Sequence, residues 1–308
     1  MKPIQKLQEL LETVKVGHTP RLAVAAGNDP DTIVAIDRAV REDVVKAKLV
    51  GDEKAILRVC EEYAIDPSRF EIVSVHNPDE ASIEAVRLVR EKEADMLMKG
   101  LVKTATYMKA ILNRETGLID EDGLLSHVAV MEIPAYPKLL IIADAAIIPA
   151  PDLDQKVRIL EYAIEVAEGL GIMMPKVALV SATETISFKV QSSVDAAVIT
   201  AMTQRKQISG AIVDGPLALD VSISPEHCNI KGLVSPIHGE ADILIFPNIE
   251  TANTFYKCST LLAKGMAASM VVGTTAPVVL TSRADEDESK FFSIVLAARI
   301  AAKRFFEV

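Results

Sequence analysis

The sequence predicts an α/β fold with mostly parallel sheets and two domains. Short apolar runs rich in Val, Ile and Leu alternate with amphipathic segments of helical length, a pattern typical of repeated βαβ units. The alternation restarts after a Pro and Asp cluster at residues 149–156. A chain of 308 residues is long enough for two domains or one large one.

The first half of the chain is predicted to open with a helix and to continue with four strands separated by helices. In the opening helix, Leu7, Leu10, Leu11 and Val14 share one face. The clearest later helix covers residues 79–93. The predicted strands are Arg21–Gly27, Ala47–Asp52, Phe70–Val75 and Asp95–Gly100.

The second half begins after an apolar run at residues 138–148, and the Pro and Asp cluster that follows is the best position for a domain junction. A long final helix is predicted from about Glu286. The predicted strands of this half are Lys176–Ala182, Ile208–Pro216, Ala241–Asn248, Ser269–Thr274 and 276–282.

Composition argues against several classes of protein. With 33 Lys and Arg against 43 Asp and Glu, the net charge is −10, so the surface as a whole repels nucleic acid. A small anionic substrate would therefore need a local basic pocket, which we expect at strand ends. The three cysteines are far apart and lack metal-binding spacing, which favours a reduced cytoplasmic protein without a structural metal. The apolar runs are too short for a signal peptide or a membrane span.

Ligands of parallel α/β sheets bind beyond the carboxyl ends of the strands, so the loops there are candidate sites. In the first such loop, Lys99 ends a buried strand and is followed by Lys103 and by Thr104, a plausible N-cap. This arrangement is a natural anion site. Lys109 and Arg114 lie further along the helix, and each taken alone reads as a solvated residue.

Three further loops carry candidate polar groups. Asp214 ends a predicted strand before a Gly-Pro turn and Asp220, where a turn role is the better interpretation. Asn248 and Asn253 flank a helix start that Thr251 could cap, and binding and capping roles remain equally open for the two asparagines. Lys257 follows in the same helix. His127 reads as a partly buried histidine with satisfied hydrogen bonds rather than a ligand or base.

The stretch TSRADEDESK (281–290) combines a helix start with a candidate reaction centre. Asp285 and Glu288 have the spacing of a capping box. Ser282 and Arg283 would stand at the mouth of the sheet, where a guanidinium can hold phosphate through two hydrogen bonds.

Taken together, the loops MKGLVKTAT, ADAAIIPAPD, IVDGPLALD, GEADILIFPNIETANTFYK and VVLTSRADEDESK resemble those of the phosphate acetyl/butyryltransferase family over nearly the whole chain. Because Arg283 is followed by Ala284 and Asp285, the butyryl branch is the more similar one. The resemblance implies interconversion of a short-chain acyl-CoA plus phosphate with an acyl phosphate plus CoA. It also implies a homodimer without a tightly bound cofactor or an essential metal, coenzyme A being a substrate.

The resemblance further implies two α/β/α three-layer domains of the isocitrate/isopropylmalate dehydrogenase-like kind, with the active site in the cleft between them. Residues 1–150 and 275–308 would form the first domain and residues 151–274 an inserted second one.

By the same carry-over, Arg283 binds phosphate and Asp285 or Asp287 is the base. The developing oxyanion needs donors such as Ser282 or backbone N–H groups. The candidates for phosphate and CoA binding are Lys99, Lys103, Thr104, Lys109, Asp214, Asn248, Asn253 and Lys257.

Three alternatives accompany this hypothesis. The first is a phosphate acetyltransferase. The second is a metal- and nicotinamide-dependent dehydrogenase on the same fold, for which Asp214 and Asp220 supply at most a fragment of a metal site and no GxGxxG is present. The third is a CoA binder without catalysis, against which the intact Ser282 and Arg283 pair argues.

Overall fold

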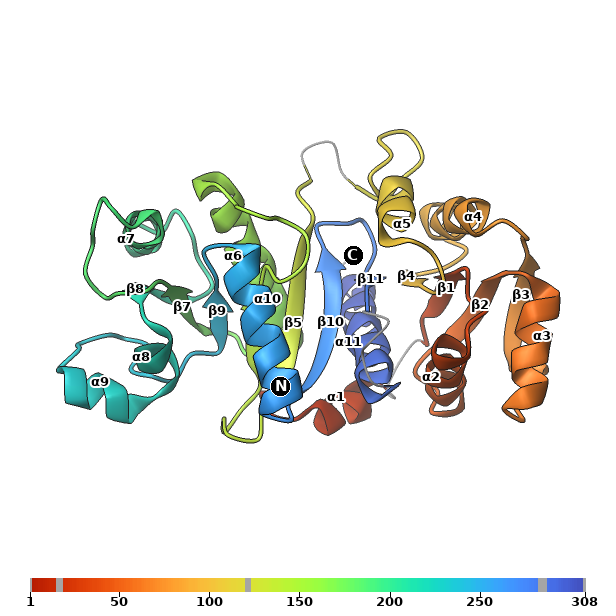
Figure 1. The fold of residues 1–308 in the computed structure, drawn as a ribbon, viewed down its shortest axis with the longest axis horizontal. Helices are drawn as coiled ribbons and strands as arrows, with labels where there is room; N and C mark the ends of the chain where they lie inside the picture. Colours follow the sequence, from red (N-terminus) through yellow and green to blue (C-terminus); the bar gives the residue numbers. More distant parts are fainter. Residues whose placement is uncertain (1, 15–18, 120–122, 282–286, 307–308) are drawn as a thin grey trace. The chain divides into compact units, whose positions relative to one another are not determined.

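The computed structural model describes residues 2–14, 19–119, 123–281 and 287–306 (Figure 1). The chain forms two compact units, which we call unit 1 (residues 1–6 and 126–267) and unit 2 (residues 7–125 and 268–308). In both, helices surround a mostly parallel sheet, so the fold is mixed α/β as the sequence predicts. Residues 126–150, expected in the same domain as the preceding residues, lie in unit 1. The reason is that two strands of this segment pair with each other and with a later strand of unit 1.

The described residues of unit 2 form six strands in the order β3-β2-β1-β4-β11-β10. All pair in parallel except β10 and β11, which are antiparallel. The strands are β1 (Arg21–Ala25), β2 (Lys46–Gly51), β3 (Phe70–Ser74), β4 (Met96–Lys99), β10 (Met266–Val272) and β11 (Val278–Val279). The helices are α1 (Leu7–Val14), α2 (Pro30–Arg41), α3 (Glu53–Glu62), α4 (Pro78–Arg90), α5 (Thr104–Ile111) and α11 (Asp287–Phe306), with a short 3₁₀ turn at Pro67–Arg69.

The helices of unit 2 begin and pack as their sequences dictate. The α2, α3 and α4 helices each start behind an Asp or Asn whose side chain accepts backbone N–H groups of the first turn. Leu7, Leu10, Leu11 and Val14 are all buried, which confirms the predicted apolar face of α1. This face contacts α11, and α11 also packs against α2.

Unit 1 contains five strands in the order β5-β6-β9-β7-β8. β5 and β6 are antiparallel, and the remaining pairs are parallel. The strands are β5 (Ser126–Glu132), β6 (Leu140–Ala143), β7 (Lys176–Val180), β8 (Ile212–Leu217) and β9 (Ile243–Ile245). The helices are α6 (Leu153–Gly169), α7 (Gln191–Gln204), α8 (Leu219–Ile223), α9 (Pro225–Lys231) and α10 (Ile249–Lys257), followed by a π-helical turn at Cys258–Leu262.

The Pro and Asp cluster after β6 starts a helix, as the sequence predicts. Asp152 is the N-cap of α6 and forms a capping box with Gln155, each side chain accepting the other residue's backbone N–H. Strand β5 is absent from the predicted strands, although its first six residues are all buried.

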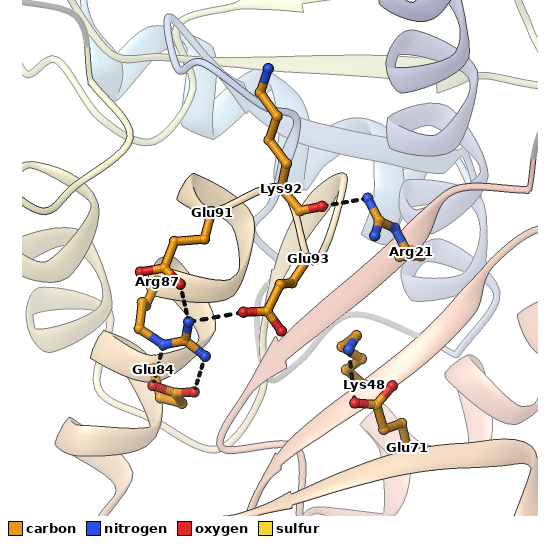
Figure 2. A network of polar contacts seen from close by, with 8 residues as sticks. All are labelled: Arg21, Lys48, Glu71, Glu84, Arg87, Glu91, Lys92 and Glu93. Atoms are coloured by element: carbon orange, nitrogen blue, oxygen red, sulfur yellow. Dashed lines mark hydrogen bonds and ion pairs between the residues drawn. The ribbon is translucent and has the colours of Figure 1, made fainter.

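A surface network of ion pairs ties the C-terminal end of α4 to the loop before β4 (Figure 2). The Arg87 guanidinium donates to Glu84 at 2.7 Å and to Glu93 at 2.9 Å, and it also pairs with Glu91. The hydrogen bond from Arg87, together with its charge, lowers the pKa of Glu84, although partial burial acts in the opposite direction.

We expect the contribution of Glu84 to stability to depend on pH. Its folded-state pKa lies below the ordinary value of 4.5, so its contribution is present above that pH and is lost as pH falls through the folded-state value. Glu84→Gln should therefore cause a small loss of stability at pH 7, typical of a partly exposed ion pair, and the loss should shrink at acidic pH. Urea unfolding at pH 7 and in the acidic range measures this difference. A loss of the same size at every pH would contradict the assignment.

Candidate functional site

The carboxyl ends of three neighbouring strands in unit 2 meet at one small cavity. Strands β1, β4 and β11 pair side by side in parallel, so the residues that follow them lie at the same edge of the sheet. A cavity of about 170 Å³ opens there. It is lined by the start of α2 (Asp29, Pro30, Asp31, Thr32), the end of β4 (Lys99, Gly100, Leu101), Thr281 after β11, and Lys290 of α11.

Gly100 allows the chain to turn at the end of β4. Its N–H donates to Ala25 O at 2.8 Å, so the backbone runs directly against the end of β1. A Cβ atom at this position would lie 2.4 Å from Ala26 O, inside the van der Waals contact distance. Glycine is therefore required where Lys99 turns away from the sheet.

Two lysines line the cavity, and both are almost completely buried. Lys99 is 7% exposed, and its Nζ donates to Gly100 O at 3.1 Å. Lys290 is 4% exposed, and its Nζ lies 3.3 Å from Asp31 Oδ2 and 4.0 Å from Asp287 Oδ1. Both of these carboxylates are more than 60% exposed, so water screens them. A buried ammonium group with only long contacts to exposed carboxylates is suited to an anion that enters the cavity.

Asp29 also lines the cavity, as the N-cap of α2. One oxygen, Oδ1, accepts the N–H of Thr32 at 3.0 Å. The other oxygen, Oδ2, is shielded from solvent and has no hydrogen-bond partner within the described part of the chain. A buried acceptor without a partner is costly, which makes this oxygen a place where a donor would be stabilised.

The remaining candidates of the first loop lie on α5, outside this cavity. Lys103 occupies the N-cap position without a side-chain hydrogen bond. Thr104 is the first helical residue, so its prediction as the N-cap is wrong by one position. Lys109 lies further along α5, where it lines a groove of about 440 Å³ between α4 and α5. The structure therefore brings Lys99, but neither Lys103, Thr104 nor Lys109, to the cavity.

Ser282, Arg283 and Asp285 lie outside the described residues, directly after the cavity residue Thr281. Asp287 is the first residue of α11 and is exposed. Glu288 pairs with Arg38 of α2 at 2.5 Å, and the capping box predicted for it with Asp285 involves a residue outside the described ranges. The same Arg38 guanidinium lies 3.8 Å from the centre of the Phe291 ring, so this contact fixes the start of α11 against α2.

In unit 1, Asp144 organises the loop that follows β6. Its carboxylate accepts the N–H groups of Ala146, Ile147 and Ile148 at 2.8, 2.9 and 3.2 Å and the hydroxyl of Ser126 at 3.1 Å. Asn253 donates its side-chain amide to Ala145 O at 3.1 Å. The loop is thereby joined to α10.

The other candidates of unit 1 also have structural contacts. Asn248 is the N-cap of α10 and accepts the N–H of Thr251, so the asparagine caps the helix rather than Thr251. Asp214 lies inside β8, which continues through the Gly-Pro pair to Leu217, and its carboxylate accepts the Ser235 hydroxyl. The prediction that Asp214 ends the strand is wrong. Lys257 is the exposed last residue of α10.

His127 is a buried histidine for which the sequence predicts hydrogen-bond partners at the imidazole ring. It is 6% exposed on β5, and its Nδ1 is buried without a hydrogen-bond partner among the residues that the structure describes. Burial lowers the pKa of the imidazole, while the nearby charge of Asp144 acts in the opposite direction. The expectation of satisfied hydrogen bonds is therefore wrong for Nδ1.

Asp29 and Lys290 are the cavity residues that sequence reasoning missed. Asp29 lies in a loop that the strand-end rule selects, but its sequence pattern, Asp before Pro, predicts a helix cap. Lys290 is the last residue of the charged stretch 281–290 and has no pattern of its own. More than 250 residues separate the two in the sequence, so only the folded chain reveals that they share a cavity.

Within the described ranges, no group of three or more His, Cys, Asp or Glu side chains is arranged to hold a metal ion. Among those same residues, no helix is both long and apolar enough to span a bilayer.

The family model and the relatives below are all phosphate acyltransferases. Residues 76–298 match the family model described as phosphate acetyl/butaryl transferase. Phosphate butyryltransferase of Clostridium beijerinckii is 42% identical over 97% of this chain and 99% of its own. Phosphate acetyltransferase of Thermotoga maritima is 44% identical over 96% of this chain and 99% of its own. The crystal structure of a branched-chain phosphotransacylase from Enterococcus faecalis has a TM-score of 0.81 and 35% identity, covering 92% of this chain and 99% of that one.

Proposed function

We propose that this chain, which belongs to the phosphate acetyl/butyryltransferase family, interconverts a short-chain acyl-CoA and phosphate with an acyl phosphate and free CoA. The observation that carries the proposal is the basic cavity at the carboxyl edge of unit 2, where buried Lys99 and Lys290 lie next to Thr281, the residue before Ser282 and Arg283. A chain with a net charge of −10 repels anions as a whole, so a buried pair of ammonium groups suits an anionic substrate.

The reaction transfers an acyl group between sulfur and oxygen. A phosphate oxygen attacks the thioester carbonyl, a C–O bond forms and a C–S bond breaks, and the proton that hydrogen phosphate loses ends on the sulfur of CoA. The tetrahedral state between them carries an oxyanion, which needs hydrogen-bond donors in place before the reaction. In the opposite direction the thiol, with a reference pKa of about 8.5, must first lose its proton.

We assign the roles of the residues by carry-over from the family. Arg283 binds phosphate, Ser282 donates to the oxyanion, and Asp285 or Asp287 takes the proton of the CoA thiol. Lys99 supports this assignment because it is buried beside Thr281 in the same cavity. Seven further residues remain candidates for contacts to the rest of CoA. They are Lys103, Thr104 and Lys109 of α5, and Asp214, Asn248, Asn253 and Lys257 of unit 1.

The acyl group is proposed to be of about butyryl size. The support is the Arg-Ala-Asp order at residues 283–285, which resembles the butyryl branch. Acetyl transfer is the second candidate, because an acetyltransferase relative is 44% identical to the chain and a butyryltransferase relative 42%.

The setting of the reaction is part of the same proposal. We propose a cytoplasmic homodimer with CoA as a substrate and no tightly bound cofactor. We also propose that the fold is of the isocitrate/isopropylmalate dehydrogenase-like kind, with two α/β domains.

A turnover screen tests the proposed function. The full chain is incubated with phosphate and acetyl-, propionyl-, butyryl-, isobutyryl- or valeryl-CoA, and free thiol and acyl phosphate are measured together. Equal amounts of both products, formed only when phosphate is present, are expected, with the highest kcat/KM for butyryl- or isobutyryl-CoA. Thiol release without phosphate would indicate hydrolysis instead. No product from any acyl-CoA in either direction would refute the proposal, and a nicotinamide absorbance change with hydroxy acids would favour the dehydrogenase.

A further inference from the structure

We infer that the unit 2 cavity selects a protonated oxyanion, hydrogen phosphate. Asp29 makes this selection by accepting a hydrogen bond from the O–H group of the anion. The inference rests on the proposed function for the role of phosphate as a substrate. The new part is a division of roles: Lys99 and Lys290 attract the anion, and the Asp29 carboxylate repels any anion that carries no hydrogen. It assigns a phosphate contact to Lys290 and a specificity role to Asp29.

The two ammonium groups supply the attraction. Lys290 can donate three hydrogen bonds, and among the described residues its Nζ has one acceptor, Asp31, at 3.3 Å. Charge-assisted N–H···O bonds are usually 2.7–2.9 Å long, so this contact is weak. Lys99 lines the same cavity. An oxyanion between these side chains would accept the short hydrogen bonds that the buried cation otherwise lacks.

Asp29 determines which oxyanion is accepted. Asp29 lines the same cavity as the lysines, and among the described residues its Oδ2 has no hydrogen-bond partner. A second anion close to a carboxylate is repelled, and the repulsion is strong where water is excluded. If the anion carries a hydrogen on one oxygen, that hydrogen can be donated to Oδ2 and the repulsive contact becomes a hydrogen bond. Specificity of this kind depends on a group that disfavours the wrong ligand.

Hydrogen phosphate fits this requirement and sulfate does not. At neutral pH phosphate keeps one P–O–H group, whereas sulfate, of the same tetrahedral shape, is fully deprotonated. With its hydrogen held by Asp29, the phosphate would present an unprotonated oxygen for attack on the thioester. The hydrogen held at Asp29 is the one that hydrogen phosphate loses when the acyl phosphate forms.

The chain provides a matched set of variants. Asp29→Asn keeps the size of the side chain and its ability to cap α2, since Asn and Asp are equally good N-caps. It removes the negative charge and adds an N–H₂ donor. Asp52→Asn is the control: Asp52 caps α3 in the same way, accepting the N–H groups of Lys54 and Ala55, and does not line the cavity. Lys290→Met removes one cation and leaves Asp29 in place.

Isothermal titration of the full chain with phosphate and with sulfate, with and without CoA present, tests the inference without requiring turnover. The wild type and Asp52→Asn should bind phosphate at least tenfold more tightly than sulfate. Asp29→Asn should reduce this ratio at least tenfold, mainly through tighter sulfate binding. Lys290→Met should weaken both anions by about tenfold or more and leave the ratio within threefold of the wild type.

A second comparison uses the wild type alone, in case Asp29→Asn does not fold. Arsenate carries a hydrogen at neutral pH as phosphate does, and selenate lacks one as sulfate does. Arsenate should therefore bind like phosphate and selenate like sulfate. Equal affinities for protonated and unprotonated anions, or an unchanged ratio in folded Asp29→Asn, would overturn the inference. Absence of acyl transfer in the turnover screen would instead count against the proposed function, and the anion selectivity would still decide the role of Asp29.

Discussion

Arg283→Ala is expected to lower kcat/KM for phosphate in acyl phosphate formation by about 10²–10³-fold, the size of effect seen when one preorganised donor to a developing charge is removed. The guanidinium would hold phosphate through two parallel hydrogen bonds, a geometry that the single ammonium group of a lysine cannot supply. Initial rates at varied phosphate and saturating acyl-CoA measure the change, and both a higher KM for phosphate and a lower kcat are expected.

Two further variants make the result specific. Arg283→Lys keeps the charge and loses the fork, so it should recover part of the lost activity. Arg58→Ala removes an arginine from the exposed face of α3 and should behave like the wild type. The Arg58 guanidinium donates to Lys54 O. If Arg283→Ala retained the wild-type KM for phosphate, Arg283 would have to be removed from the proposed phosphate site.

The fold class could be predicted because its signal is local. Buried parallel strands are short apolar runs, and the helices between them show one apolar face, so alternation alone indicates the βαβ pattern. Strand β5 was missed because its run Val128–Met131 is only four residues long and could equally be part of a buried helix. The end of β8 was misplaced because Asp, Gly and Pro usually mark turns, whereas here Leu217 still pairs with Val180 of β7.

A residue of the candidate site could be predicted from the sequence only where a charged side chain stands at a position that the pattern predicts to be buried. Lys99 follows three buried strand residues, and a lysine there needs polar surroundings for its ammonium group. In the structure, Lys99 lines the cavity. Asn248 and Asn253 show no such conflict, and the sequence left their roles open. The structure gives Asn248 a capping contact and Asn253 a contact that holds the loop after β6. Asp29 and Lys290 come together only through the packing of α11 on α2, which no local pattern encodes.

Asp195→Ala is expected to have the largest effect on stability, a loss of about 3–5 kcal/mol in the free energy of unfolding. In unit 1, Lys156 of α6 and Asp195 of α7 form an ion pair of 2.6 Å, and each side chain is about 10% exposed or less. Gln191 donates to the other oxygen of Asp195 at 2.8 Å, so the carboxylate is satisfied on both sides. Removing it leaves the Lys156 ammonium buried without its counter-ion, and the cost of that desolvated charge is the main term.

The same helix offers a matched control. Arg158 and Glu161 of α6 form an ion pair of 3.0 Å in which the side chains are 49% and 37% exposed. Glu161→Ala should cost less than about 1 kcal/mol, because water solvates the arginine that remains. Lys156→Met combined with Asp195→Leu should recover much of the loss of Asp195→Ala, since apolar side chains of similar size replace both charges. Urea unfolding measures all three variants. A loss below about 1 kcal/mol for Asp195→Ala would mean that water reaches Lys156, because only a solvated ammonium could lose its counter-ion at so small a cost.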